Sequence, residues 1–147
     1  AMDNDVTRIS IIEVPDHPGI AFKIFSALAA NKINVDIILQ SVGRAGTKDI
    51  SFTVSTSQKE DALRISEELK SVIGAKEVTF NDNVSKVSIV GAGMLSNPGV
   101  AAMMFEALGE NNINISMIST SEIKISVLIE QDLAKKAVNA IHDKFDL

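Results

Sequence analysis

The chain of 147 residues contains no cysteine, no tryptophan and no tyrosine, and it has only two histidines. Without cysteine there is no disulfide, no thiolate metal ligand and no thiol nucleophile. The histidines, His17 and His142, are too few for a metal cluster, and neither has the partner residues of a catalytic centre. The sequence therefore predicts no catalytic residue, no metal site and no cofactor.

The chain also lacks a long apolar run and a cluster of basic residues. A membrane-spanning helix needs about 20 apolar residues, and binding to nucleic-acid phosphates needs grouped lysine and arginine. The net charge is -5, with 46% hydrophobic and 22% charged residues. No signal peptide is recognisable at the start. We therefore expect a cytoplasmic globular protein that binds neither membranes nor nucleic acids.

What the sequence does contain is an internal repeat. The stretch PDHPGIAFKIFSALAANKINV, which begins at Pro15, corresponds to SNPGVAAMMFEALGENNINI, which begins at Ser96. Both copies have Pro-Gly at the same place, apolar residues at helical spacing and an Ile-Asn pair after the helix. Self-similarity of this density predicts two copies of one structural unit.

Each copy predicts strand, helix, two strands and a second helix, and the first copy adds a fourth strand. Each first helix starts at the Pro-Gly and is expected to close at Asn31 or Asn111 in left-handed geometry. SQKE at Ser57 predicts a capping box, Gly74 a helix end and Asp132 an N-cap. The expected strands are 8–14, 35–42, 49–55 and 76–80 in the first copy, and 86–90, 113–119 and 123–130 in the second.

This order of elements is the split ferredoxin-like βαββαβ arrangement, an α+β fold. Both helices of a unit are expected to pack on one face of an antiparallel sheet. The two tandem units are predicted to span residues 6–82 and 83–147. The second unit reaches the end of the chain without a fourth strand.

The Pro-Gly helix starts are the candidate binding sites. Proline at a helix start sacrifices no hydrogen bond, and glycine lets a ligand approach the backbone. The amides of Gly19, Ile20 and Ala21 suit a small carboxylate, while Asp16 offers charge toward an ammonium or hydroxyl group. Such a socket fits a zwitterionic amino acid, and a plain loop-to-helix turn is the alternative. The charged turn from Arg44 to Lys48 is predicted to be solvated.

Three segments resemble the tandem ACT domains that form the regulatory region of aspartate kinases of the monofunctional bacterial type. They are DHPGIAFKIFSALAANKINVDIILQSV, VSKVSIVGAGMLSNPGVAAMMFEAL and NINISMISTSEIKISVLI, and the likeness covers nearly the whole chain. Nothing in the chain resembles the kinase domain. The resemblance therefore implies a regulatory chain that is not itself an enzyme, either an excised fragment or a separate subunit.

In that family threonine, lysine or both bind between ACT units and inhibit aspartate phosphorylation in lysine, threonine and methionine biosynthesis. The resemblance implies such an effector, a kinase catalytic domain or subunit as partner, and a homodimer formed by ACT–ACT pairing. It also implies that a strand upstream of the first copy completes the second sheet. Two other functions stay open, namely an amino-acid sensor of a different regulator and a dimerisation module without ligand.

The resemblance assigns residues to two effector sockets. The first comprises Asp16, Gly19, Ile20, Ala21, Gln40, Asn112 and Ile113. The second comprises Ser96, Pro98, Gly99, Val100, Ala101, Ser121, Asn34 and Val35. Ser96 stands where the first socket has Asp16, so the two sockets are expected to differ chemically. Asn34 fits helix-to-strand turn chemistry equally well.

Overall fold

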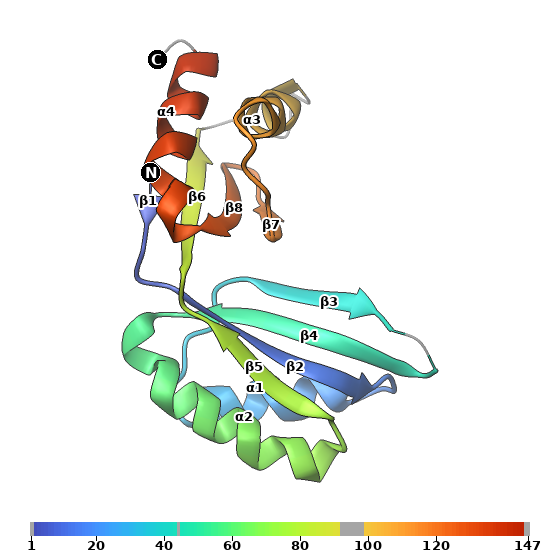
Figure 1. Cartoon of the computed structure of the whole chain (residues 1–147). Helices are drawn as coiled ribbons and strands as arrows, with labels where there is room; N and C mark the ends of the chain where they lie inside the picture. The colour runs from blue at the N-terminus through green and yellow to red at the C-terminus, as the bar shows by residue number, and fades with distance from the viewer. Residues whose placement is uncertain (1, 44, 92–98, 146–147) are drawn as a thin grey trace. The chain divides into compact units, whose positions relative to one another are not determined.

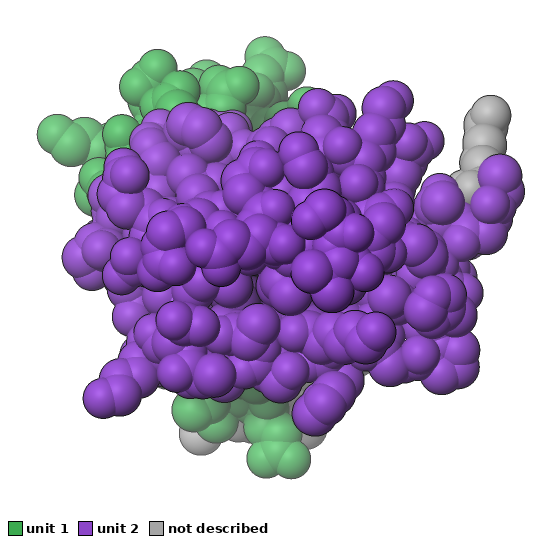
Figure 2. Space-filling view, turned by 90° about the horizontal axis from the view of Figure 1, so that it is seen from below, with its two compact units in different colours: residues 1–4, 83–147 green, residues 5–82 purple. Residues whose placement is uncertain are grey.

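The chain forms two compact units. The computed structural model describes residues 2–43, 45–91 and 99–145. The N-terminal unit comprises residues 5–82, and the C-terminal unit comprises residues 1–4 together with 83–147; they are purple and green in Figure 2. Each unit has a hydrophobic core of its own. Within the described residues, no helix is long and apolar enough to cross a membrane.

The N-terminal unit is a four-stranded antiparallel sheet with two helices on one face (Figure 1). Its strands lie in the order β3-β4-β2-β5. Alternation along the central strands directs Ile9, Ile11 and Phe52 toward the helices, where all three are fully buried. The elements are β2 (Thr7–Pro15), α1 (Ile20–Ala30), β3 (Ile38–Val42), β4 (Thr47–Val54), η1 (Thr56–Gln58), α2 (Lys59–Ile73) and β5 (Glu77–Asn81).

The C-terminal unit repeats this plan, with strands in the order β1-β6-β8-β7. Its elements are β1 (Met2–Asp3), β6 (Val84–Val90), α3 (Gly99–Glu110), β7 (Met117–Thr120), β8 (Lys124–Glu130), η3 (Gln131–Leu133) and α4 (Ala134–Lys144). The prediction of an α+β fold with two ferredoxin-like units is confirmed.

Two buried serine pairs relate the central strands of the two units. The hydroxyl oxygens of Ser10 and Ser51 lie 2.7 Å apart, and those of Ser88 and Ser126 lie 2.7 Å apart. In both units the two serines face each other across the two central strands. This register makes β2 equivalent to β6 and β4 equivalent to β8. The remaining positions of these strands can then be matched between the units by counting from the serines.

The fourth strand of the C-terminal sheet comes from the N-terminal residues of the same chain. Met2 pairs with Val87, and Asp3 pairs with Lys86. In this way β1 takes the place that β5 takes in the other unit. The strand lies upstream of the first copy, as the resemblance implied, although the chain itself was expected to lack it. The strand has only two residues, which is too few to show any periodicity in the sequence.

The first helices close differently from the prediction. Asn31 has φ -97°, and the residue in the left-handed region is the next one, Lys32, with φ 60°. In the second copy the left-handed residue is Asn112, with φ 56°. The side-chain amides of Asn31 and Asn111 each donate to the carbonyl oxygen four residues earlier, at 2.8 Å. Both asparagines therefore cap helix carbonyls with their side chains, so the backbone turns one residue later.

The second helices also start differently from the prediction, although Gly74 ends α2 with φ 79° as expected. The hydroxyl of Ser57 contacts that of Ser55 at 3.1 Å, and neither α2 nor α4 has a side-chain cap. A short 3-10 turn precedes each helix instead. At the first of these turns the amide of Thr56 donates to the carboxylate of Asp5 at 2.9 Å. This carboxylate is remote in sequence, so a local capping pattern could not predict it.

Replacement of Lys32 by asparagine is expected to raise the free energy of unfolding by about 0.5 kcal/mol. Asparagine tolerates left-handed geometry better than lysine, for which that geometry is strained. The converse change, Asn112→Lys, serves as the matched control and is expected to lower the free energy by a similar amount. Urea unfolding followed by circular dichroism measures both. Equal stabilities of both variants and the parent chain would show that the left-handed backbone is unstrained.

Candidate functional site

A hollow of about 330 Å³ lies at the start of α1 in the N-terminal unit. Its residues come from the loop after β2, the first turn of α1, and the two neighbouring strands β3 and β4. They are Asp16, His17, Pro18, Gly19, Ala21, Gln40 and Lys48. Of the residues predicted for the first socket, the structure thus brings Asp16, Gly19, Ala21 and Gln40 together.

A β-bulge in β2 brings Asp16 to this hollow. The register of β2 against β4 shifts just before Val14, and Glu13 has φ 52°. The amide of Glu13 donates to the carboxylate of Asp49 at 2.8 Å, which ties the bulge to β4. Pairing resumes with Val14 opposite Lys48. The bulge therefore redirects the end of β2 so that Asp16 lies beside Lys48.

The start of α1 leaves backbone donors without a side-chain cap. Gly19 is the N-cap residue, with φ 91°, and no side chain accepts a hydrogen bond from the helix start. The amide of Ile20 lies 3.4 Å from the carbonyl oxygen of His17, at the long end of the hydrogen-bond range. Within the described residues, the amides of Gly19 and Ala21 form no hydrogen bond with another backbone group. Amides of this kind, at the positive end of a helix dipole, attract anions.

The side chains of the hollow include an ion pair. Nζ of Lys48 lies 3.3 Å from Oδ1 of Asp16, and the exposed fractions of the two side chains are 16% and 54%. The amide of Asp16 donates to the carbonyl oxygen of Gly46 at 2.8 Å, which holds the loop against the β3–β4 turn. Gln40 adds a neutral amide to the wall. The hollow thus combines a carboxylate, an ammonium, an amide and free backbone donors, which are the groups that recognise a zwitterion.

Lys48 was missed because its turn was predicted to be solvated. Lys48 alternates with Ile50 and Phe52, whose side chains lie on the helix face of β4. This alternation in the sequence could have indicated that the side chain of Lys48 lies on the same face. Ile20, in contrast, was expected at the site, and its side chain is buried in the core. Only the backbone of Ile20 is therefore available at the hollow.

Asn112 and Ile113, predicted to complete the first socket, lie just after α3 in the C-terminal unit. Their amides donate to the carbonyl oxygens of Gly109 and Leu108 at 3.2 and 3.0 Å. The side chain of Ile113 is buried in the core of its own unit, and Asn112 is exposed. These contacts belong to the end of the helix, and a role at the first socket stays a prediction.

The second socket is described only in part. Ser96 and Pro98 lie outside the described residues. Gly99, Val100 and Ala101 form the first turn of α3, as the repeat predicted. This turn corresponds to the start of α1, where the hollow of the N-terminal unit lies.

Thr120 rather than Ser121 takes the place of Gln40 in the second unit. Thr120 faces Ile125 across β7 and β8, as Gln40 faces Ile50 across β3 and β4. Ser121 comes one residue later, in the turn between the strands. The spacing of 80 residues that matches the two helices also matches Gln40 to Thr120, and it matches Ser121 to Ser41.

Asn34 and Val35, the remaining predicted residues, lie between α1 and β3. The amide of Asn34 donates to Oε1 of Gln58 at 3.0 Å, and Nε2 of Gln58 donates to the carbonyl oxygen of Lys32 at 2.9 Å. Val35 is half-buried against the core of the N-terminal unit. Gln58 therefore holds the helix-to-strand connection in place, which agrees with the turn interpretation of Asn34.

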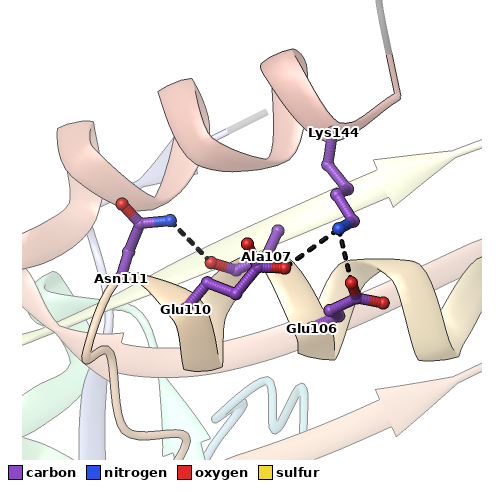
Figure 3. Close-up of polar contacts among 5 residues, drawn as sticks. All are labelled: Glu106, Ala107, Glu110, Asn111 and Lys144. Carbon is purple, nitrogen blue, oxygen red and sulfur yellow. Dashed lines mark hydrogen bonds and ion pairs between the residues drawn. The ribbon is translucent and has the colours of Figure 1, made fainter.

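A second charged cluster joins the helices of the C-terminal unit. Nζ of Lys144 in α4 lies 2.6 Å from a carboxylate oxygen of Glu106 and 2.9 Å from one of Glu110, both in α3 (Figure 3). The hydrogen bond from Lys144 lowers the pKa of the Glu106 carboxyl group. The hydrogen bonds to Glu106 and Glu110 raise the pKa of the Lys144 ammonium. Each charge thus favours the ionised form of the other.

Replacement of Lys144 by methionine is expected to lower the melting temperature at pH 7, with a loss that shrinks toward acid pH. A carboxyl group with a lowered folded-state pKa stabilises the fold above its unfolded-state pKa. That contribution disappears as the pH falls through the lowered pKa of Glu106. Thermal unfolding from pH 7 to pH 3 measures the difference, with exposed Lys135→Met on the same helix as control. A difference that is constant over this range contradicts the assignment.

Comparisons with known proteins agree with this arrangement. ACT-domain family models match residues 7–74 and 87–145. The aspartate kinase of Pseudomonas putida is 48% identical over the whole chain, which spans 36% of the length of that relative. The crystal structure of aspartokinase alpha and beta subunits is 46% identical with a TM-score of 0.94, and the match covers 100% of this chain and 97% of that one.

The ligand-free regulatory subunit of aspartate kinase from Thermus thermophilus is 42% identical with a TM-score of 0.94. That match covers 99% of this chain and 95% of the Thermus chain. The residues that match are thus those of a whole regulatory subunit, and about a third of the length of a curated aspartate kinase. These residues therefore belong to the aspartate kinase family and correspond to its regulatory pair of ACT domains.

Proposed function

We propose that this chain is the amino-acid sensor of an aspartate kinase. In this role it binds threonine, lysine or both at the helix starts of its ACT units, and the bound effector inhibits the phosphorylation of aspartate. The hollow at the start of α1 is the observation that carries the proposal. It unites Asp16, Gln40 and Lys48 with the uncapped amides of α1, and its volume falls in the range of small-ligand sites.

The charges of the hollow fit a free amino acid in one orientation. The α-carboxylate is placed at the amides of Gly19 and Ala21, where the helix dipole favours an anion. The α-ammonium is placed at Asp16, which is the acidic residue of the wall. The effector side chain then lies toward Gln40, whose amide group can bind a hydroxyl.

Pairing between two copies of the chain is part of the proposal. All five residues of the edge strand β3 are exposed, and Ile38, Leu39 and Val42 have exposed fractions of 49%, 40% and 100%. An apolar edge strand of this kind is a template for pairing with another chain. A homodimer formed along these edges would complete the sockets with Asn112 and Ile113. Sedimentation velocity that finds only monomer with and without threonine contradicts this pairing.

The effector must act by favouring one arrangement of the paired units. A ligand with millimolar to ten-micromolar affinity provides roughly 4 to 7 kcal/mol of binding free energy. Allosteric coupling usually needs only about 1 to 3 kcal/mol of it. The ligand must therefore bind more tightly to the arrangement in which the attached kinase domain is inactive. Equal activity of the whole kinase with and without bound effector would contradict this mechanism.

A thermal-shift screen against the common amino acids tests the sensor function directly. A ligand present at 100 times its dissociation constant is expected to stabilise the chain by about 2.7 kcal/mol. A shift with threonine or lysine supports the proposal. A shift with an unrelated amino acid alone indicates a sensor of a different regulator, and no shift with any amino acid indicates a dimerisation module.

A further inference from the structure

Lys48 lines the α1 hollow, and the sheet holds its backbone in place. It lies opposite Val14 in β2 and opposite Val42 in β3, so both of its neighbouring strands fix its backbone. Its side chain is only 16% exposed, and its ammonium lies 3.3 Å from the carboxylate of Asp16. A positive charge therefore has a defined place in the wall.

The two charged side chains of the hollow balance each other, so among the described lining residues no carboxylate is left for a further positive charge. Asp16 is the single carboxylate among the residues that line it, and Lys48 already neutralises that carboxylate. The other titratable group in the wall is His17, and Gln40 is neutral. A zwitterionic ligand carries its own carboxylate as well as its ammonium, so it leaves the net charge of the hollow unchanged. An amino acid with a cationic side chain brings an ammonium that no group of the wall neutralises.

The second unit shows that the fold itself does not need a lysine at this position. The serine pairs match Ser51 to Ser126, and this register places Ile123 at the position of Lys48. Ile123 has an exposed fraction of 55%. In the same unit Thr120 replaces Gln40, so the wall strands of the second unit carry no charge at the matched positions. The charge of Lys48 therefore serves the α1 hollow and not the sheet.

We infer that Lys48 is a specificity-determining residue, which excludes amino acids with a cationic side chain from the α1 hollow and admits neutral ones such as threonine. This inference rests on the proposed function, because it names the class of ligand for the same site. Repulsion between the Lys48 ammonium and a second ammonium a few ångströms away is expected to weaken binding roughly tenfold.

The test uses backbone amides that report on this hollow alone. The ¹⁵N-labelled chain is titrated separately with threonine and with lysine, and the shifts of the Gly19 and Ala21 amides yield two dissociation constants. The parent chain is expected to prefer threonine by roughly tenfold or more. Lys48→Met is expected to reduce that preference about tenfold, and Lys48→Gln serves as a second neutral variant. Lys70→Met on α2 removes the same charge elsewhere and is expected to leave the preference unchanged.

The outcomes separate this inference from the proposed function. Suppose that threonine shifts both amides, and that the preference for threonine over lysine is the same in the parent chain and in both Lys48 variants. The inference is then overturned, and the sensor function stands. Equal affinities of threonine and lysine for the hollow of the parent chain also overturn it. If neither amino acid shifts the amides in any variant, the hollow is not an effector site, and the proposed function fails together with the inference.

Discussion

Replacement of Asp16 by alanine is expected to weaken threonine binding at the α1 hollow by about 10- to 100-fold. The change removes a charge-assisted contact to the ligand ammonium, which is worth about 1.5 to 3 kcal/mol, and about 1.4 kcal/mol corresponds to a factor of ten. It also leaves Lys48 without its partner at 3.3 Å, so a positive charge faces the incoming ammonium. Titration calorimetry measures the threonine affinity.

A matched control for this variant is Asp61→Ala on α2. Asp61 is exposed and pairs with Arg64 on the same helix, at 3.6 Å, so its loss changes the net charge equally. The control is expected to bind threonine like the parent chain. In a parallel NMR titration of the ¹⁵N-labelled chain with threonine, the amides of Val100 and Ala101 in α3 report on the second socket. Equal weakening of both sockets by Asp16→Ala would show that the two sites are wrongly assigned.

Replacement of Phe52 by alanine is expected to cost about 3 to 5 kcal/mol of unfolding free energy, the largest stability effect predicted for this chain. Phe52 lies in the central strand β4, opposite Ile9, and is fully buried. Its ring packs edge-on against that of Phe25, with centroids 5.8 Å apart. Removing the ring leaves a cavity that the sheet and the helices cannot close.

The loss of stability in Phe52→Ala is expected in the N-terminal unit and not in the C-terminal unit. Phe52 belongs to the core of the N-terminal unit, and the C-terminal unit has a separate core. Hydrogen exchange is therefore expected to show lost protection in residues 5–82 and near-normal protection in the strands β6 and β8. Phe22→Ala is the matched control, because Phe22 is 75% exposed and its loss is expected to change stability by less than about 0.5 kcal/mol. Uniform loss of protection would show that the two units unfold together.

The sequence by itself determined the repeat, the order of the elements and the family. These features are local: Pro-Gly marks each first helix start, alternation marks the central strands, and Gly74 ends α2 without a distant partner. The same local character explains the correct placement of Gly19 and Ala21 at the hollow, since a helix start needs only its own residues. Periodicity and turn chemistry are properties of neighbouring residues, so they can be recognised without knowledge of the tertiary structure.

Contacts between residues far apart in the chain were decided only by the tertiary structure. The ion pair of Asp16 with Lys48 depends on a bulge in β2 that Asp49 ties to β4. The cap that Asp5 provides at Thr56 and the pairing of β1 with β6 likewise join distant residues. In each case the stabilising contact needs a partner that the pairing of the strands brings close. The register of that pairing is a property of the assembled sheet. For that reason the sequence located the helix start that lines the hollow, and only the fold placed Lys48 in its wall.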